Sequence, residues 1–188
     1  RPGYDYMAQA MGGIMSVTGD ADGPPMKVGV GIADIMTGMY ATSAILAAIH
    51  HRTVTGKGQY IDMALLDSQV AWLSSSGQNS LTSREPVPRF GNAHPNIVPY
   101  QVFPTSDGHF ILAVGNDRQF VRFCNFAGNP DLATDPRFTT NELRLHNREA
   151  LAPLIHALTV TKSSTDWIDG LSAIGVPSGA VNTLEQTF

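Results

Sequence analysis

Residues 28–41 read Val28-Gly-Val-Gly-Ile-Ala-Asp-Ile-Met-Thr-Gly-Met-Tyr-Ala41, and this stretch decides the fold of the first part of the chain. Its first residues are small and apolar and predict a short extended segment over 26–32. After Asp34, apolar residues recur at helical spacing to about His51, which predicts a long helix over 33–51. Asp34 therefore stands where an extended segment turns into a helix.

A carboxylate at a helix start receives hydrogen bonds from unpaired backbone N–H groups and faces the positive end of the helix dipole, and both favour its anionic form. Small residues on either side let a bulky substrate approach the oxygens of Asp34. They are Gly29, Gly31, Ala33 and Gly38. This is how a carboxylate nucleophile would be presented. An aspartate that only caps a helix has the same local sequence, so the pattern alone leaves both interpretations open.

Around this stretch the sequence predicts mainly helices, turns and one strand. Helical spacing is found over 4–15 and over 65–76, and Pro24 and Pro25 mark a loop over 20–25. Alternation over 59–64 predicts a strand after a turn at 53–58. We assign residues 1–76 to one domain on this pattern.

The composition changes over 77–99, where Gly, Ser and Asn give way to several prolines, and we interpret this segment as a linker. A second, small α+β domain is predicted over 100–188. It opens with apolar runs at 100–103 and 109–114 around an Asp-Gly turn, a pattern typical of a β-hairpin. Later segments are predicted as three helices and a final extended piece, namely 117–127, 140–158, 163–174 and 175–181.

The composition excludes several classes of protein. The chain has 188 residues, 43% of them hydrophobic, and 12 basic against 16 acidic residues, which argues against a nucleic-acid-binding surface. Its single cysteine, Cys124, cannot form an internal disulfide. We found no signal peptide and no apolar run of about 18 residues, so we expect a cytoplasmic protein that does not bind membranes. The histidines are too scattered to predict a metal site.

Three segments, in this order and with matching gaps, resemble the class III CoA-transferases, the CaiB/BaiF family. They are Arg1-Pro-Gly-Tyr-Asp-Tyr-Met-Ala-Gln-Ala-Met-Gly-Gly-Ile-Met-Ser-Val-Thr-Gly19, the Asp34 segment, and Thr55-Gly-Lys-Gly-Gln-Tyr-Ile-Asp-Met-Ala-Leu-Leu-Asp67. The similarity continues through 91–103 and 113–120, so it covers nearly the whole chain. The resemblance implies an α/β fold in which 1–76 is the back part of a Rossmann-like large domain.

The resemblance also implies a reaction. Asp34 would attack an acyl-CoA thioester and carry the acyl group as a mixed anhydride, and then carry CoA as an aspartyl thioester. The CoA thioester is a substrate, and no bound cofactor is implied. By the same resemblance Pro2, Gly3, Tyr4 and Asp5 line the CoA site. The related α-methylacyl-CoA racemases carry a histidine where Tyr4 stands, and tyrosine is a poor proton shuttle near neutrality, which favours a transferase.

Residues 113–120 stand in the position of the family's glycine-rich loop, which closes over the active site as a lid. This chain departs from the poly-glycine form, and we expect Gly115, Asp117, Arg118 and Gln119 to contact substrate. A guanidinium matches a carboxylate in bidentate geometry, so Arg118 is a candidate for binding the distal carboxylate of a dicarboxylic acid. An ordinary helix N-terminus is the alternative interpretation of this segment.

Family members are roughly twice as long as this chain and form dimers of interlocked subunits. The resemblance therefore implies an internal fragment of a homodimeric enzyme whose substrates are an acyl-CoA and a carboxylic acid. Two alternatives remain at this stage. One is a racemase of the same fold, and the other is a non-catalytic polypeptide that lacks most contacts to CoA.

Overall fold

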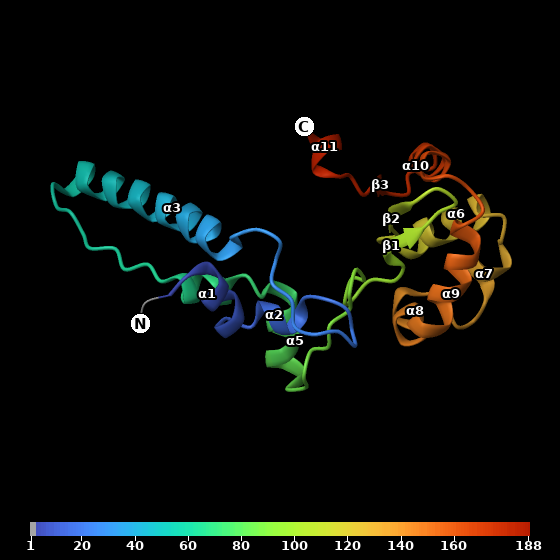
Figure 1. The fold of residues 1–188 in the computed structure, drawn as a ribbon, viewed down its shortest axis with the longest axis horizontal. Helices are drawn as coiled ribbons and strands as arrows, with labels where there is room; N and C mark the ends of the chain where they lie inside the picture. The colour runs from blue at the N-terminus through green and yellow to red at the C-terminus, as the bar shows by residue number, and fades with distance from the viewer. Residues whose placement is uncertain (1–2) are drawn as a thin grey trace. The chain divides into compact units, whose positions relative to one another are not determined.

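The computed structural model describes residues 3–188 and divides the chain into two compact units. The first unit extends to Gly91, and the second comprises Asn92–Phe188. Their boundary falls inside the proline-containing segment 77–99. Figure 1 shows the elements of each unit along the chain.

The first unit is helical throughout its described elements. Helix α1 packs against both α3 and α4, so the Asp34 segment is held by the beginning of the chain. No strand is assigned within 3–91, and the Rossmann-like sheet implied by the resemblance is not seen there. The helices are α1 (Asp5–Met11), α2 (Ile14–Val17), α3 (Ile32–Thr55), α4 (Leu65–Ala71) and α5 (Ser74–Ser83).

One local prediction for this unit is wrong, and the segment interpreted as a linker is partly helical. The alternating segment 59–64 lies outside any helix or strand. A strand is stable only where a neighbouring strand completes its hydrogen bonds. Among the described residues, no strand pairs with segment 59–64. The first part of the segment predicted as a linker is helix α5, in which the side chains of Gln78 and Thr82 are linked across one turn at 2.9 Å. Its serine- and glycine-rich composition resembles a loop.

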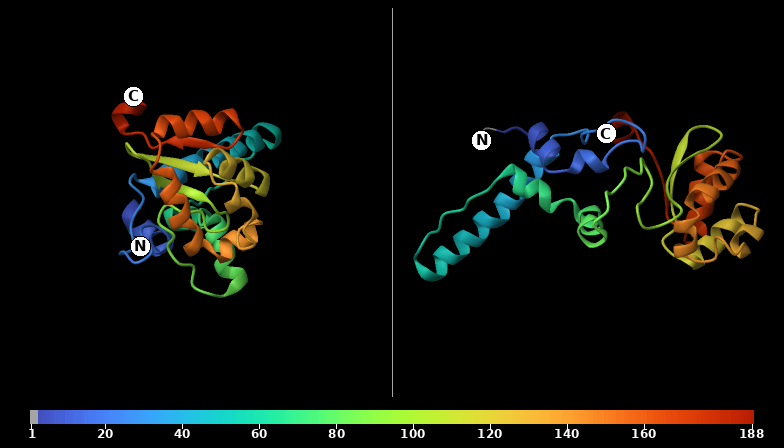
Figure 2. Two further views of the ribbon diagram at one scale, coloured as in Figure 1. Left: turned by 90° about the vertical axis from the view of Figure 1, so that its right-hand side faces the viewer. Right: turned by 90° about the horizontal axis from the view of Figure 1, so that it is seen from below.

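Helix α3 begins at Ile32, one residue before the predicted start, and continues to Thr55 as one uninterrupted helix (Figure 2). It ends at Gly56, whose φ of 73° is a left-handed conformation that suits glycine and whose N–H bonds to the Arg52 carbonyl oxygen. Within α3, burial is confined to Ala33. Large apolar side chains along the rest of the helix are exposed, namely Ile35, Met39, Tyr40, Ile45, Leu46, Ile49 and Val54.

By length and composition α3 is long and apolar enough to cross a membrane. The expectation that the chain contains no such run is therefore wrong. A single helix of this kind is weak evidence for membrane insertion, because apolar helices inside ordinary proteins pass the same test. What α3 does establish is a long apolar surface that the first unit itself leaves uncovered.

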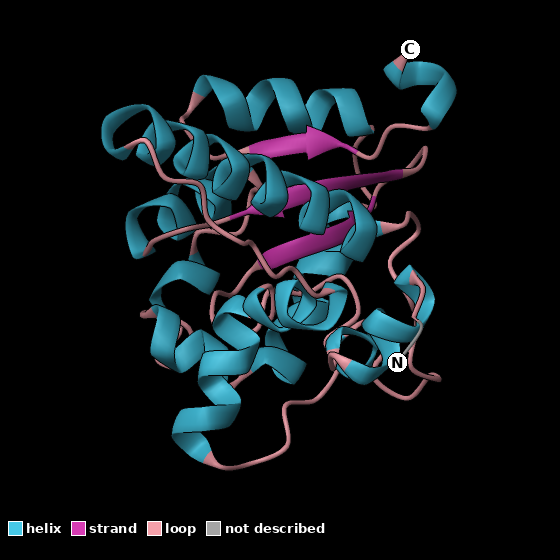
Figure 3. Cartoon of the chain, turned by 90° about the vertical axis from the view of Figure 1, so that its left-hand side faces the viewer, coloured by secondary structure: helices cyan, strands magenta, loops and turns pink. Residues whose placement is uncertain are grey.

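The second unit is built on a three-stranded antiparallel sheet of order β1-β2-β3 (Figure 3). β1 (Tyr100–Pro104) and β2 (His109–Ala113) form the predicted hairpin, with Phe103 opposite Phe110. β3 (Ser178–Ala180) pairs with the other edge of β2. The final extended segment of the sequence thus returns to complete the sheet.

Helices surround this sheet, and α10 contacts both β2 and β3. The predicted helix 140–158 is interrupted at Asn147, whose side-chain amide donates to the carbonyl oxygens of Leu143 at 2.9 Å and Arg137 at 3.2 Å. An asparagine that bonds to the backbone in this way competes with helix continuation. The helices are α6 (Asp117–Phe126), α7 (Asp131–Thr134), α8 (Asn141–His146), α9 (Arg148–Thr159), α10 (Ser164–Ala173) and α11 (Leu184–Thr187).

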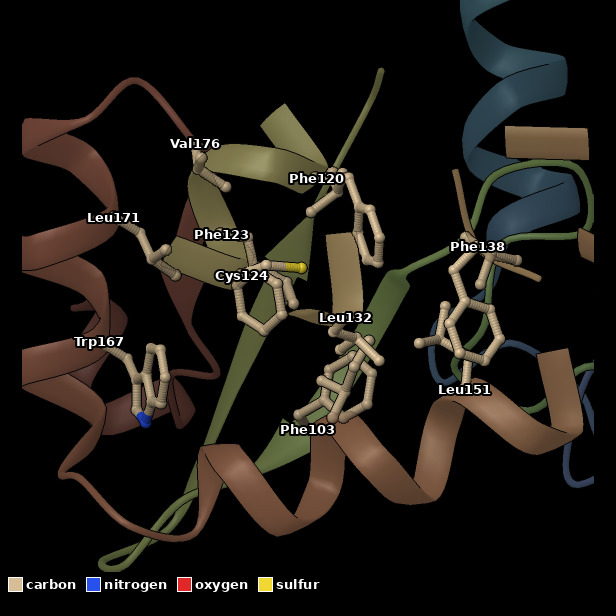
Figure 4. Close-up of a cluster of buried hydrophobic side chains, with 14 of the residues drawn as sticks. Phe103, Phe120, Phe123, Cys124, Leu132, Phe138, Leu151, Trp167, Leu171 and Val176 are labelled. Atoms are coloured by element: carbon tan, nitrogen blue, oxygen red, sulfur yellow. The ribbon is translucent and has the colours of Figure 1, made fainter. Parts of the chain in front are cut away.

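The core of the second unit is a cluster of aromatic and aliphatic side chains from the sheet and the helices (Figure 4). Trp167 is fully buried and donates its indole N–H to the Thr159 carbonyl oxygen at 2.8 Å, so its polar atom is satisfied. The Phe126 ring packs against Gly170, where a Cβ atom would lie 2.0 Å from the ring. The cluster includes Phe103, Phe110, Phe120, Phe123, Cys124, Leu151, Trp167 and Leu171.

The hairpin turn is attached to the start of α10 by Asp107. One oxygen of its carboxylate accepts hydrogen bonds from the Ser164 backbone N–H at 2.8 Å and from the Thr105 hydroxyl at 2.9 Å. These bonds, led by that from the Ser164 N–H, lower the pKa of Asp107 below its ordinary value. The ionised carboxylate is therefore favoured by the folded state.

Replacing Asp107 by Asn should lower the thermal stability of the second unit at neutral pH. Because the Asp107 pKa is lowered on folding, its stabilising effect is present above the ordinary carboxyl pKa and is lost as the pH falls through the folded value. The difference in Tm between wild type and Asp107→Asn should therefore shrink below about pH 4. Asp169→Asn on α10 is the control, and a pH-independent difference for Asp107→Asn would contradict the assignment.

Cys124 is fully buried in the core, and burial raises the pKa of its thiol to about 12. The protonated thiol stabilises the fold fully below about pH 9, and this contribution is lost as the pH rises towards 12.

A thiol reagent at pH 8 should react with Cys124 about 10³-fold more slowly in the native chain than in urea, because so little thiolate is present in the native chain. Rapid labelling of the native protein would show that the thiol is exposed.

Candidate active site

Asp34 is the third residue of α3 and lies exposed in the first helical turn. Gly31 directly precedes the helix, and a Cβ atom there would lie 3.9 Å from an Asp34 carboxylate oxygen and 3.8 Å from the Asp5 carboxyl carbon. The two carboxylates therefore converge on Gly31. Its lack of a side chain leaves the space beside them open. The structure thus brings Asp34 and Asp5, which are 29 residues apart in the sequence, to one place.

The carboxylate of Asp5 is bound by the protein itself. One oxygen accepts the backbone N–H of Ala33 at 2.8 Å, and the other accepts the side-chain amide of Gln9 at 2.7 Å. The first bond satisfies one of the free N–H groups at the start of α3, a role that a capping residue of the helix itself usually performs. Asp5 is thus a cap supplied by another helix, a role the sequence did not indicate.

Gln9 was not predicted as a functional residue. It lies one turn after Asp5 on α1, is fully buried, and reaches the segment that leads into α3. Its carbonyl oxygen accepts the Val28 N–H at 2.9 Å, and its amide group lies 3.4 Å from the Val30 carbonyl oxygen. The available signal was its spacing of four from Asp5, which places both side chains on one face of α1.

Tyr4 and Gly3 border a cavity of about 720 Å³ between α1 and the start of α4. Tyr4 is 81% exposed and precedes the first residue of α1. Pro2 lies outside the described residues. The other lining residues are mostly apolar and include Met7, Met11, Met63 and Leu66.

The segment 115–119 lies in the second unit. Gly115 and Asn116 form the loop before α6, and residues 117–119 are the first turn of that helix. The Gln119 side-chain oxygen accepts the Gly115 N–H at 2.8 Å, and its amide donates to the Gly175 carbonyl oxygen at 3.3 Å. Asn116 caps α6 by accepting the Gln119 N–H at 3.0 Å. Gln119 therefore shapes the loop through bonds to the backbone on both sides.

Asp117 is paired with Arg144 at 2.8 Å. The Arg144 side chain is fully buried, donates to the carbonyl oxygens of Val98 and Phe138, and lies over the Phe120 ring at 4.5 Å. A buried guanidinium is stable only when its donors are satisfied, and Asp117 supplies the balancing charge. Asp117 is thus engaged in holding the start of α6.

Arg118 differs from its neighbours. Its side chain is exposed, and its guanidinium has no hydrogen-bond or ion-pair partner among residues 3–188. Its side chain borders a hollow of about 380 Å³ with Asn116, Asp117, Gln119 and Arg122. Arg122, one turn later, donates to the Ile174 carbonyl oxygen at 3.1 Å. Among the predicted loop residues, the guanidinium of Arg118 is the group left free to meet a ligand.

Residues 3–188 contain no group of three or more His, Cys, Asp or Glu side chains that could hold a metal ion. The first unit contains an exposed carboxylate at the start of a helix. It also contains an apolar cavity, which the residues just before α1 border. The second offers an unpaired guanidinium in a polar hollow. The first arrangement suits attack on an activated acyl group, and the second suits binding of an anion.

Comparison with known proteins gives the chain its family. The profile of CoA-transferase family III matches residues 1–188. A succinate–glutarate CoA-transferase from Agrobacterium fabrum is 48% identical over 186 residues, covering 99% of this chain and 46% of that protein. Mouse succinyl-CoA:glutarate CoA-transferase is 40% identical over 188 residues, covering 100% and 43%.

A solved structure agrees with these sequences. The crystal structure of a CaiB/BaiF family protein from Brucella suis superposes with a TM-score of 0.83 at 48% identity, covering all of this chain and 50% of that one. The chain spans about half the length of the curated relatives it matches. Its fold, its ordered motifs and these similarities agree, and the chain belongs to CoA-transferase family III.

Proposed function

We propose that the intact protein transfers CoA from an acyl-CoA thioester to a free carboxylic acid, with Asp34 as the covalent carrier. Membership of the family and the names of both relatives support CoA transfer. The exposed carboxylate of Asp34 at the start of α3 is the observation that carries the assignment of the nucleophile. The relatives are transferases, and Tyr4 stands where a racemase has histidine, so we favour transfer over racemisation.

The reaction proceeds in four balanced steps. The Asp34 carboxylate attacks the thioester carbonyl, and a mixed anhydride forms as CoA leaves as its thiolate. The thiolate attacks the aspartyl carbonyl, which releases the donor acid and leaves CoA on Asp34 as a thioester. The acceptor carboxylate attacks this thioester, giving a second anhydride and CoA thiolate. The thiolate then attacks the acceptor's carbonyl, forming the new acyl-CoA and restoring the Asp34 carboxylate.

Each step passes through a tetrahedral oxyanion. The N–H groups of Ile32, Ala33 and Ile35 are already bonded within the first unit. Other backbone N–H groups close to the reacting carbonyl would have to stabilise the oxyanion, and losing one such donor typically costs about 3 kcal/mol. The cavity bordered by Gly3 and Tyr4 has apolar walls that suit the pantetheine end of CoA. We assign Pro2, Gly3, Tyr4 and Asp5 to this end of the CoA site, Asp5 through its place beside Asp34.

We propose a dicarboxylic acid as acceptor, with its distal carboxylate bound by Arg118. The unpaired guanidinium in its polar hollow supports this role, and succinate and glutarate in the relatives' names are dicarboxylates. Gly115 and Gln119 contribute by shaping the loop, and Asp117 by fixing the start of α6. We further propose a homodimer, which would cover apolar side chains that α3 leaves exposed.

Replacing Asp34 by Asn in the intact protein should reduce kcat at least about 10³-fold, because the amide is a poor nucleophile. Incubation of the wild type with acyl-CoA and hydroxylamine should place a hydroxamate on Asp34, detected by mass spectrometry of the peptide. Asp22→Asn, in an exposed loop of the same unit, should leave both results unchanged. Full activity of Asp34→Asn would remove Asp34 as the carrier.

Replacing Arg118 by Met should raise the KM for succinate or glutarate about 10- to 100-fold, because a charge-assisted bidentate contact is lost. The KM for a monocarboxylic acceptor of similar length should change little. Arg122→Met is the matched control, since Arg122 lines the same hollow but is bonded to a backbone carbonyl. An equal effect of Arg118→Met on both kinds of acceptor would contradict the role in dicarboxylate binding.

A further inference from the structure

The start of α3 is connected to α1 by a chain of three side-chain hydrogen bonds. The Val28 N–H donates to the Gln9 carbonyl oxygen, the Gln9 amide donates to one Asp5 oxygen, and the other Asp5 oxygen accepts the Ala33 N–H. The two ends of this chain, Val28 and Ala33, flank the glycine-containing segment before the helix. Both ends of that segment are therefore tied to one face of α1.

Gln9 is the member of this chain that water cannot readily replace. Its side chain is fully buried, and both ends of its amide group are bonded. Without it, the Val28 N–H and one oxygen of Asp5 would each lose a partner next to the protein interior. Unpaired buried polar groups are costly, so the segment would shift to regain partners. Gly29 and Gly31 leave that segment free to shift.

We propose that Gln9 is a positioning residue for Asp34, acting through Asp5. Gln9 fixes the orientation of the Asp5 carboxylate, and Asp5 fixes the N–H of Ala33, the residue directly before Asp34. The inference rests on the proposed function, because it assumes that Asp34 is the carrier. A displacement of a reacting group by about 1 Å can cost about 10²-fold in rate, so small movements at this link are sufficient to lower kcat.

The order of donors and acceptors along the chain provides a specific test. Gln9→Glu places two carboxylates side by side, so the bond between positions 5 and 9 loses its donor. Asp5→Asn places the amide N–H groups of positions 5 and 9 side by side, so the same bond loses its acceptor. In the double variant the amide introduced at position 5 donates to the carboxylate introduced at position 9, which still accepts the Val28 N–H. The amide oxygen at position 5 still accepts the Ala33 N–H. The double variant has the same net charge as the wild type, and one matched bond takes the place of another.

In the intact protein each single variant should lower kcat, and the rate of Asp34 hydroxamate formation, about 10²-fold. The double variant should recover at least about tenfold of this loss, which is the coupling expected of directly bonded residues. In Gln9→Glu the KM for acyl-CoA should change less than about threefold, because Gln9 is buried and is not among the residues assigned to the CoA site. Gln78→Glu, which alters an exposed glutamine bond on α5, is the matched control and should have no effect.

Hydrogen exchange of the Ala33 amide gives a readout that is independent of activity. Exchange should be faster than wild type in both single variants and should return towards wild type in the double variant. Wild-type kcat and wild-type Ala33 exchange in Gln9→Glu would overturn the proposal. So would a double variant that restores Ala33 protection but leaves kcat about 10²-fold low, since the charge on Asp5 would then be what matters.

If the single variants do not fold, the double variant decides, because it keeps the bonds to the Val28 and Ala33 N–H groups and the bond between positions 5 and 9. It loses only the long contact of 3.4 Å to the Val30 carbonyl oxygen. Recovery of fold and kcat supports the link, and a folded double variant with low kcat overturns it. Failure of the proposed function gives a different result. No hydroxamate would form on Asp34 in the wild type, while Ala33 exchange would still respond to Gln9→Glu.

Discussion

The hydrogen bond from the Ala33 N–H to the Asp5 carboxylate is the contact on which the arrangement of the first unit depends. A helix start has unpaired N–H groups, and α3 has no side-chain cap of its own because Gly31 occupies the capping position. The cap comes instead from α1. Asp34 therefore does not cap the helix, and its side chain is exposed in the first turn. A side chain at position 31 would have filled the space beside both carboxylates, because a Cβ atom there would lie 3.8 Å from the Asp5 carboxyl carbon and 3.9 Å from an Asp34 oxygen.

The second unit shows a similar division of roles around Arg144. Its guanidinium is buried and makes three sets of contacts, to the segment before β1, to the segment after α7 and to the start of α6. The carboxylate of Asp117, although half-exposed, is thereby held in an ion pair with Arg144. The guanidinium of Arg118, the next residue, has no hydrogen-bond or ion-pair partner among residues 3–188. Adjacent residues thus have opposite roles, one structural and one available to a ligand.

Much of the local structure could be predicted from the sequence, and the reasons are physical. The start of α3, the hairpin over 100–113 and the segments of α6 and α10 follow from the spacing of apolar residues and from turn and capping residues. The prediction of a strand over 59–64 was wrong because a strand depends on a partner strand that the local sequence does not specify. The prediction of one helix over 140–158 was wrong because the Asn147 side chain bonds to the backbone, and packing decides whether it does so.

The candidate site divides in the same way. The family could be identified from ordered motifs, and the role of Asp34 stays a prediction. The bonds of Asp5, Gln9 and Asp117 join side chains to partners distant in the sequence, so local patterns do not predict them.

The exposed apolar side chains of α3 have a consequence for the purified polypeptide. At high protein concentration, molecules of this chain will tend to associate through α3, and a mild detergent should prevent that association.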